Sequence, residues 1–171
     1  MKFLLGVVVG LAAIPVVALA MAWLGVFPMH AKEVPPGWEE KFAQYALKRA
    51  VERNAPHVTN PLPQTDETLL AGLKVFRNAC SGCHGDAGGT SDYGASFYPP
   101  VPQFAKNPPH LADWQLFYVI KNGVRYSGMS AWDGQWRNGV SDDRMWKVAT
   151  FLSRLDSLPP AVEEEWHKKQ Q

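Results

Sequence analysis

Two cysteines and a histidine stand close together in the chain, at Cys80, Cys83 and His84. On a helix, residues three and four apart share a face, so all three side chains would project from the same side. Two thiols at this spacing can add to the two vinyl groups of a haem and form thioethers, and the adjacent imidazole can bind the iron as the proximal ligand. The motif therefore predicts one covalently attached haem c, with His84 as a metal ligand.

Other roles for the two cysteines fit the sequence less well. They are the only cysteines in the chain, and a disulfide across a two-residue gap closes almost no loop. A thioredoxin-like redox pair would need a βαβ pattern and no histidine, while a zinc site would need two further ligands at suitable spacing. A plain disulfide or a chance pair is the alternative to haem attachment.

A helix is predicted directly before the motif. Thr65 can cap its start, and the acidic side chains of Asp66 and Glu67 suit the positive end of its dipole. Apolar residues form one face of this helix, namely Leu69, Leu70, Leu73 and Phe76. The helix runs into Cys80, so it would position the motif.

Two further helices are predicted downstream, over residues 112–122 and 142–155, the second capped by Ser141. Residues 85–109 are rich in glycine and proline, and such a loop is too long for a compact domain unless something organises it. A large flat cofactor could do so. Because no segment alternates as a strand does, an all-α domain is predicted.

These features resemble the class I c-type cytochromes, which carry one haem. The resemblance covers residues 65–157, and its motifs are Gly72 and Phe76 on the first helix, Cys-Ser-Gly-Cys-His-Gly, and Trp146 with Phe151-Leu152 on the closing helix. In that family a glycine and an aromatic residue of the first helix pack against aromatic residues of the last. The resemblance implies an electron carrier rather than an enzyme, with no small-molecule substrate.

The family also places a methionine on a downstream loop as the sixth iron ligand, typically after a glycine. Gly128-Met129 fits this pattern, whereas Met145 lies within the last predicted helix and is expected to pack there. His110 is the rival ligand. An open sixth site, or one ligated by His110, would instead indicate a haem sensor or enzyme. A thioether ligand favours ferrous iron and predicts a moderately high reduction potential.

A proline carbonyl orients the proximal imidazole in this family. Pro102, within Pro102-Gln103-Phe104, is the residue expected to accept that hydrogen bond from His84, and Pro99 and Pro100 compete with it for the role.

Further residues around the haem are implied by the same resemblance. Arg125 and Tyr126 precede the methionine loop and would bond the haem propionates. Trp132 and Trp136 follow that loop and would wall the haem crevice.

Residues 3–27 carry no charge and would form a helix of roughly 37 Å, longer than the hydrocarbon core of a bilayer is thick. They predict a transmembrane anchor, with residues 1–2 in the cytoplasm. Ala18-Leu19-Ala20 also fits a signal-peptidase site, but apolar character continues through Trp23 to Phe27 and favours the anchor. Both interpretations deliver the remaining chain to the periplasmic side.

The rest of the chain divides into three predicted parts. Residues 28–64 form a linker with a helix over about 38–54, residues 65–159 form the cytochrome c domain, and residues 160–171 form a polar tail. The helix at 38–54 has a loose apolar stripe, so it either packs on the haem domain or lies near the membrane surface. A haem domain tethered through residues 55–64 would swing between a fixed donor and acceptor.

Charge limits the range of partners. The 17 basic and 16 acidic side chains nearly cancel, and no basic run could follow a phosphate backbone, so nucleic-acid binding is excluded. The expected partners are redox proteins or a membrane electron-transport complex. The sequence thus predicts a membrane-tethered carrier or a cytochrome subunit of a respiratory or photosynthetic complex.

Overall fold

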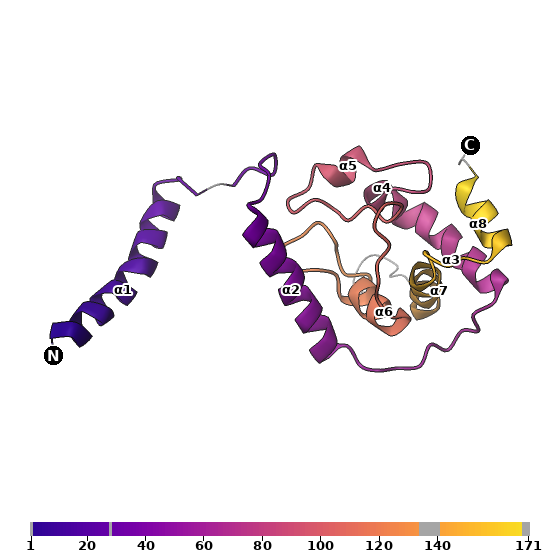
Figure 1. Cartoon of the computed structure of the whole chain (residues 1–171), viewed down its shortest axis with the longest axis horizontal. Helices are drawn as coiled ribbons and strands as arrows, with labels where there is room; N and C mark the ends of the chain where they lie inside the picture. The colour runs from indigo at the N-terminus through magenta and orange to yellow at the C-terminus, as the bar shows by residue number, and fades with distance from the viewer. Residues whose placement is uncertain (1, 28, 134–140, 169–171) are drawn as a thin grey trace. The chain divides into compact units, whose positions relative to one another are not determined.

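The chain folds into helices (Figure 1). The computed structural model describes residues 2–27, 29–133 and 141–168. Within these ranges the β-type pairing is a single isolated bridge between Asp86 and Gly89. The predicted all-α fold class is therefore confirmed. The chain divides into two units, Met1–His30 and Ala31–Gln171.

The first unit contains α1 (Lys2–Trp23), a continuous 22-residue helix that includes Pro15. None of its residues is buried. Among the described helices it alone is long and apolar enough to cross a membrane, a test that a signal sequence near the N-terminus also passes. The length and composition of α1 thus fit a membrane anchor or a signal sequence.

The second unit contains the other described helices. In chain order these are α2 (Gly37–Asn54), α3 (Asp66–Ala79), α4 (Ser81–His84), α5 (Asp92–Ala95), α6 (Asp113–Asn122), α7 (Asp142–Ser153) and α8 (Pro160–His167). The long predicted helices agree with α2, α3, α6 and α7 to within a few residues, and Thr65 and Ser141 cap α3 and α7 as predicted. The short helix α5 was not predicted.

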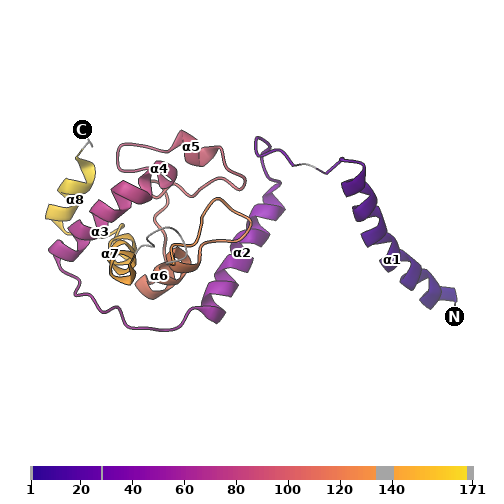
Figure 2. The ribbon, with the colours of Figure 1, turned by 180° about the vertical axis from the view of Figure 1, so that it is seen from behind.

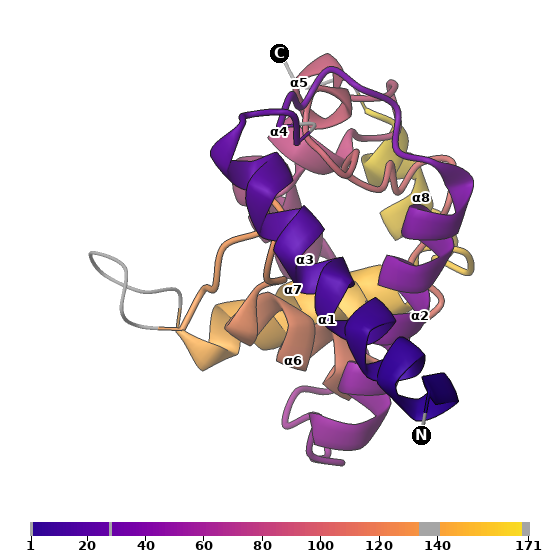
Figure 3. The same cartoon turned by 90° about the vertical axis from the view of Figure 1, so that its left-hand side faces the viewer.

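The core of the second unit forms where α3 crosses α7. Figure 1 shows α7 almost end-on beside α3, and Figure 3 shows it along its length. A Cβ atom on Gly72 would lie only 2.1 Å from the Lys147 carbonyl oxygen and 2.7 Å from the Phe151 Cβ atom. Only glycine therefore permits this approach, and it brings the rings of Phe76 and Phe151 within 5.8 Å.

Trp146 departs from the expected packing. It was expected against Gly72 and Phe76, but its ring stacks on Phe117 of α6, with the ring centroids 4.1 Å apart and the planes at 8°. Trp146 lies five residues before Phe151, which is more than one helical turn, so the two aromatic side chains leave α7 in different directions. Met145 is fully buried in the core, as expected.

Residues 55–64 are attached to the domain rather than free. The His57 ring lies 4.0 Å from the Trp114 ring on α6. The side-chain amide of Asn60 donates a hydrogen bond to the Thr150 hydroxyl on α7, at 2.8 Å. The expectation that the haem domain swings on this segment is therefore wrong, because α2 and the core belong to one unit. Figure 2 shows α2 beside α6 from the opposite side.

The C-terminal segment also differs from its prediction. Residues 160–171 were expected to form a polar tail, but α8 brings Val162 and Trp166, one turn apart, into the core. The Trp166 ring lies 5.6 Å from the rings of both Phe76 and Phe151. The compact domain therefore continues beyond residue 159 through α8.

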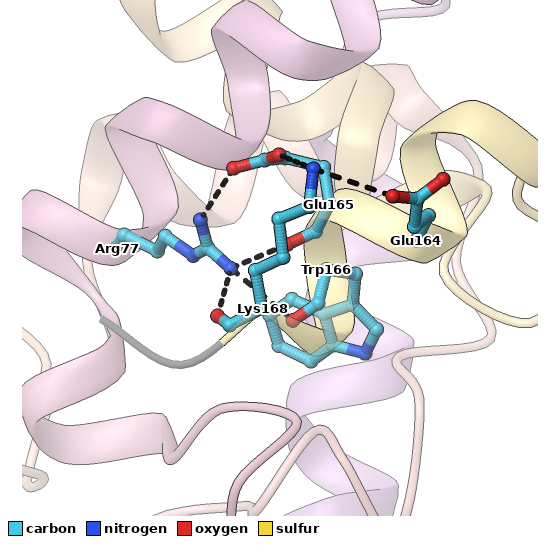
Figure 4. A network of polar contacts seen from close by, with 5 residues as sticks. All are labelled: Arg77, Glu164, Glu165, Trp166 and Lys168. Atoms are coloured by element: carbon cyan, nitrogen blue, oxygen red, sulfur yellow. Dashed lines mark hydrogen bonds and ion pairs between the residues drawn. The ribbon is translucent and has the colours of Figure 1, made fainter. Parts of the chain in front are cut away.

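Arg77 of α3 holds the end of α8 (Figure 4). Its guanidinium donates hydrogen bonds to three backbone carbonyls, those of Glu165 (2.6 Å), Trp166 (3.2 Å) and Lys168 (2.9 Å). It also pairs with the Glu165 carboxylate at 3.2 Å. The last carbonyls of a helix lack partners within the helix. The Glu165 carbonyl also accepts from the Lys168 N–H, so Arg77 adds to that bond and provides a partner for the carbonyls of Trp166 and Lys168. The Arg77 carbonyl in turn accepts a hydrogen bond from the Ser81 hydroxyl at 2.7 Å.

Replacing Arg77 with alanine should weaken the attachment of the end of α8 to α3. Because hydrogen bonds to a charged group are involved, we expect the free energy of unfolding to fall by about 2 kcal/mol. Glu165→Gln is the matched control: it removes the exposed ion pairs that the carboxylate makes with Arg77 and Lys168 and leaves the carbonyl contacts, so the free energy of unfolding should fall much less. Urea unfolding followed by far-UV circular dichroism measures the free energy of unfolding of both variants. An equal decrease in the two variants would contradict the claim that the bonds from Arg77 to the carbonyls stabilise the domain.

Candidate haem site

The cysteine and histidine side chains lie on a single helical turn. Cys80 lies between α3 and α4 as the C-cap of the first and the N-cap of the second, and its carbonyl accepts hydrogen bonds from the backbone N–H groups of Cys83 (3.1 Å) and His84 (2.9 Å) in α4. Both cysteines are partly buried and free, so both thiols are available for bonding to another group.

The Cys80 thiol is stabilised in its neutral form, unlike the reactive thiol of a redox pair. Burial, with a smaller contribution from Cys83, raises the pKa of Cys80 to about 12. A thioredoxin-like pair requires the opposite, a pKa lowered toward neutrality. Nor do the described residues contain a group of three or more His, Cys, Asp or Glu side chains placed to hold a metal ion. A zinc site therefore finds no support in this part of the chain.

His84 is oriented by two neighbours. Its Nδ1 lies 2.9 Å from the Pro102 carbonyl oxygen, and its ring stacks on Phe104 with centroids 4.2 Å apart. Burial lowers the pKa of His84, although the hydrogen bond to Pro102 acts in the opposite direction. With Nδ1 donating to that carbonyl, the neutral imidazole keeps its lone pair on Nε2, which is the arrangement of a metal-ligating histidine.

Gln103 was not identified from the sequence, yet it joins the loop to the motif. Its Nε2 donates to the carbonyls of Cys83 (3.0 Å) and Val101 (2.8 Å), and its Oε1 accepts from the Ser91 backbone N–H at 2.7 Å. The Ser91 hydroxyl also donates to the Gly82 carbonyl. A glutamine within a proline-rich loop gives no periodic signal, so only the folded contacts reveal this role.

The loop that carries Met129 folds back on the end of α6. Gly123 ends that helix with a φ of +67°, a conformation suited to glycine, and a Cβ atom there would lie 2.5 Å from the Ala131 nitrogen. The Met129 carbonyl accepts from Val124 N–H at 2.9 Å, and its own N–H donates to the Ser127 hydroxyl at 3.2 Å. The Met129 side chain is partly buried against the hydrophobic core.

The other predicted site residues occupy different settings. Trp132 is partly buried against the core, like Met129. Arg125 and Tyr126 are exposed, with the guanidinium 5.9 Å from the ring centroid and Tyr126 89% exposed. His110 is also at the surface, its side chain 77% exposed and 3.7 Å from Asp156. Trp136 lies outside the described residues.

An open cleft of about 410 Å³ lies beside the methionine loop. Residues 126–128 form one wall, residues 96–98 with Tyr93 form the other, and Ala31 also lines it. A Cβ atom on Gly128 would lie 2.3 Å from the Phe97 ring, so glycine permits the two walls to meet.

The donor set fits a c-type haem. Two free thiols and an oriented imidazole occupy one turn, and a partly buried thioether stands on a separate loop. Thioether bonds and axial iron ligands require these groups. Phe104 and Trp132, both partly buried, add apolar surface that suits a porphyrin.

Comparison with known families agrees with this geometry. The family model described as "Cytochrome C oxidase, cbb3-type, subunit III" matches residues 67–152, half of the chain. The chain therefore belongs to this family and contains a cytochrome c domain that serves haem-based electron transfer. No curated protein matches the chain.

Gln103→Leu should loosen the loop on the cysteine side of the site. The substitution leaves two carbonyls and one N–H without their partner, so we expect the free energy of unfolding to fall by about 1–3 kcal/mol. Thermal unfolding of the haem-loaded protein measures the loss. Gln115→Leu is the control, because Gln115 makes one exposed hydrogen bond at the start of α6. If Gln103→Leu destabilises the protein no more than Gln115→Leu does, Gln103 does not hold the loop to the cysteine motif.

Proposed function

We propose that this cytochrome is a membrane-anchored one-electron carrier with a single covalent haem, attached at Cys80 and Cys83 and ligated by His84 and Met129. The observation that carries the proposal is the helical turn with two free thiols and an imidazole fixed by the Pro102 carbonyl. When bound, the haem iron alternates between its ferric and ferrous states and so accepts and releases one electron.

The protein's own residues would hold that iron in one geometry. Cys80 and Cys83 would fix one edge of the porphyrin to α4. The hydrogen bond to Pro102 and the stack on Phe104 would keep the His84 ring in one orientation. Because the hydrogen bond keeps Nδ1 protonated, it also strengthens Nε2 as a ligand.

Met129 is the better supported sixth ligand. Its side chain is partly buried against the core, whereas His110 is exposed beside the Asp156 carboxylate. Using His110 would mean moving it away from solvent and from that carboxylate. Arg125 and Tyr126 stay candidates for the propionates, since both are free to turn toward a charged group at the surface.

The cellular setting follows from α1 and from the family. We infer that α1 is retained as an anchor and that the haem domain lies on the periplasmic side. The family's description names an oxidase subunit, which supports a place in a respiratory electron-transport complex with redox proteins as partners. The carrier would then pass electrons to or from fixed neighbours in the membrane.

Covalent attachment can be tested by intact mass and by the pyridine haemochrome spectrum. We expect the mass of one haem per chain, with residues 1–20 still present. Cys80→Ala together with Cys83→Ala should abolish the covalent haem, because both thioethers are lost. Covalent haem that persists in the double variant would disprove the attachment site, and loss of the first 20 residues would disprove the anchor.

The sixth ligand can be tested by spectroscopy and potentiometry. The oxidised protein should show the methionine-to-iron band in the near infrared. Met129→His should remove that band and lower the reduction potential, because imidazole stabilises ferric iron better than a thioether does. His110→Ala is the control and should change neither. Rapid carbon monoxide binding by the ferrous wild-type protein would instead support a haem sensor or enzyme with an open sixth site.

A further inference from the structure

An exposed aromatic stripe on α2 is not explained by the haem site. We propose that Trp38, Phe42 and Tyr45, here called the α2 stripe, insert into the lipid interface and hold the haem domain in a fixed orientation to the membrane. The inference rests on the proposed function in one respect, since it takes α1 as a retained anchor. It goes beyond that function by assigning a second membrane contact.

The three rings share one side of the helix. Residues four and three apart lie on neighbouring turns, so Trp38, Phe42 and Tyr45 form a continuous row. Their exposed fractions are 71%, 67% and 64%. The residue of α2 that is buried in the domain, Val51, lies about 140° around the helix from Trp38 at about 100° per residue. The stripe thus faces away from the domain contact.

Helix α2 is joined to the haem domain at both ends. Near its start, the Glu39 carboxylate interacts with the Tyr98 hydroxyl in the wall of the cleft. At its end, Val51 is buried, and the ring of His57, just beyond, contacts the ring of Trp114 at a tilt of 32°. A contact between the stripe and a membrane would therefore restrain the domain as a whole.

The length of the connecting segment limits how far the stripe can lie from the end of α1. Only residues 24–36 separate α1 from α2, and a segment of this length reaches at most about 45 Å when fully extended. A second contact made by a tethered chain is intramolecular, so a modest affinity for the interface is enough to keep it formed.

The composition of α2 points to the lipid interface as the partner. Tryptophan and tyrosine favour the depth of the headgroups, where a ring can be buried while its polar atom meets water. The charges on the helix are mixed, with Glu39, Glu40 and Glu52 against Lys41, Lys48, Arg49 and Arg53. Burial of the rings rather than attraction to anionic lipid would therefore provide the affinity, and added salt should leave the contact unchanged.

Spin labels on the full-length, haem-loaded protein in nanodiscs of neutral lipid test the contact. The native thiols are consumed by the haem, so Phe42→Cys accepts a single nitroxide. With the haem reduced, power saturation should show that this label collides more with oxygen than with a water-soluble nickel chelate. Gln44→Cys, on the other side of α2, is the control and should show the reverse. Equal water accessibility at both positions would overturn the proposal.

A third label separates this inference from the proposed anchor. Val9→Cys lies in the middle of α1 and should report lipid. Lipid at Val9 with water at Phe42 would refute the α2 contact alone, whereas water at Val9 would refute the anchor and the contact together. If the label at position 42 is shielded from the nickel chelate only when another protein subunit is present, the stripe contacts protein and the assignment to lipid is overturned.

The orientation can be measured independently in stacked bilayers. The electron paramagnetic resonance signals of the oxidised haem should change with the angle of the bilayers to the field. The triple variant W38S/F42S/Y45S should lose most of this angular dependence at unchanged haem content. Control variant A43S/A46S/A50S, also on exposed positions of α2, should keep it. A triple variant as ordered as wild type would contradict a fixed orientation.

Discussion

The close approach of α3 to α7 at Gly72 is the constraint on which the haem domain depends. A Cβ atom there would meet backbone and the base of Phe151, and overfilling such a contact costs about 1–3 kcal/mol. Because the helices are in contact, the ring of Phe76 packs near the ring of Phe151, and the ring of Trp166 from α8 packs against Phe151 as well. Cys80 directly follows α3, about two helical turns after Gly72. The contact between α3 and α7 at Gly72 therefore determines how the cysteine motif is oriented in the domain.

The two sides of the site are built by different means. On the His84 side, side-chain hydrogen bonds from Gln103 and the Pro102 carbonyl tie a long loop to one helical turn. On the Met129 side, a backbone turn after Gly123 and short contacts within the loop determine the shape. Both supports are attached to the same packed core, which suits electron transfer because little has to rearrange when the charge on the iron changes.

Local signals explain what could be predicted from the sequence. The capped helices and the cysteine motif depend on residues that are close in sequence, so local patterns predict them. Pro102 could be predicted because the family resemblance implies its role. Gln103 and Asn60 act through partners distant in sequence, so no local pattern marks them. The sequence of α8 resembles a polar tail because only Val162 and Trp166 of its residues are buried, too few to give a clear apolar face.

The position of Trp166, far downstream of the cysteine motif, affects the order of events during synthesis. A chain is made from its N-terminus onward, so the turn with Cys80 and Cys83 emerges well before the last aromatic ring of the core exists. Until α8 arrives, Phe76 and Phe151 lack one neighbour and Arg77 lacks the carbonyls that it binds. Both thiols are thus presented on an incompletely packed domain, so a group that is to be joined to them can approach before α8 completes the core.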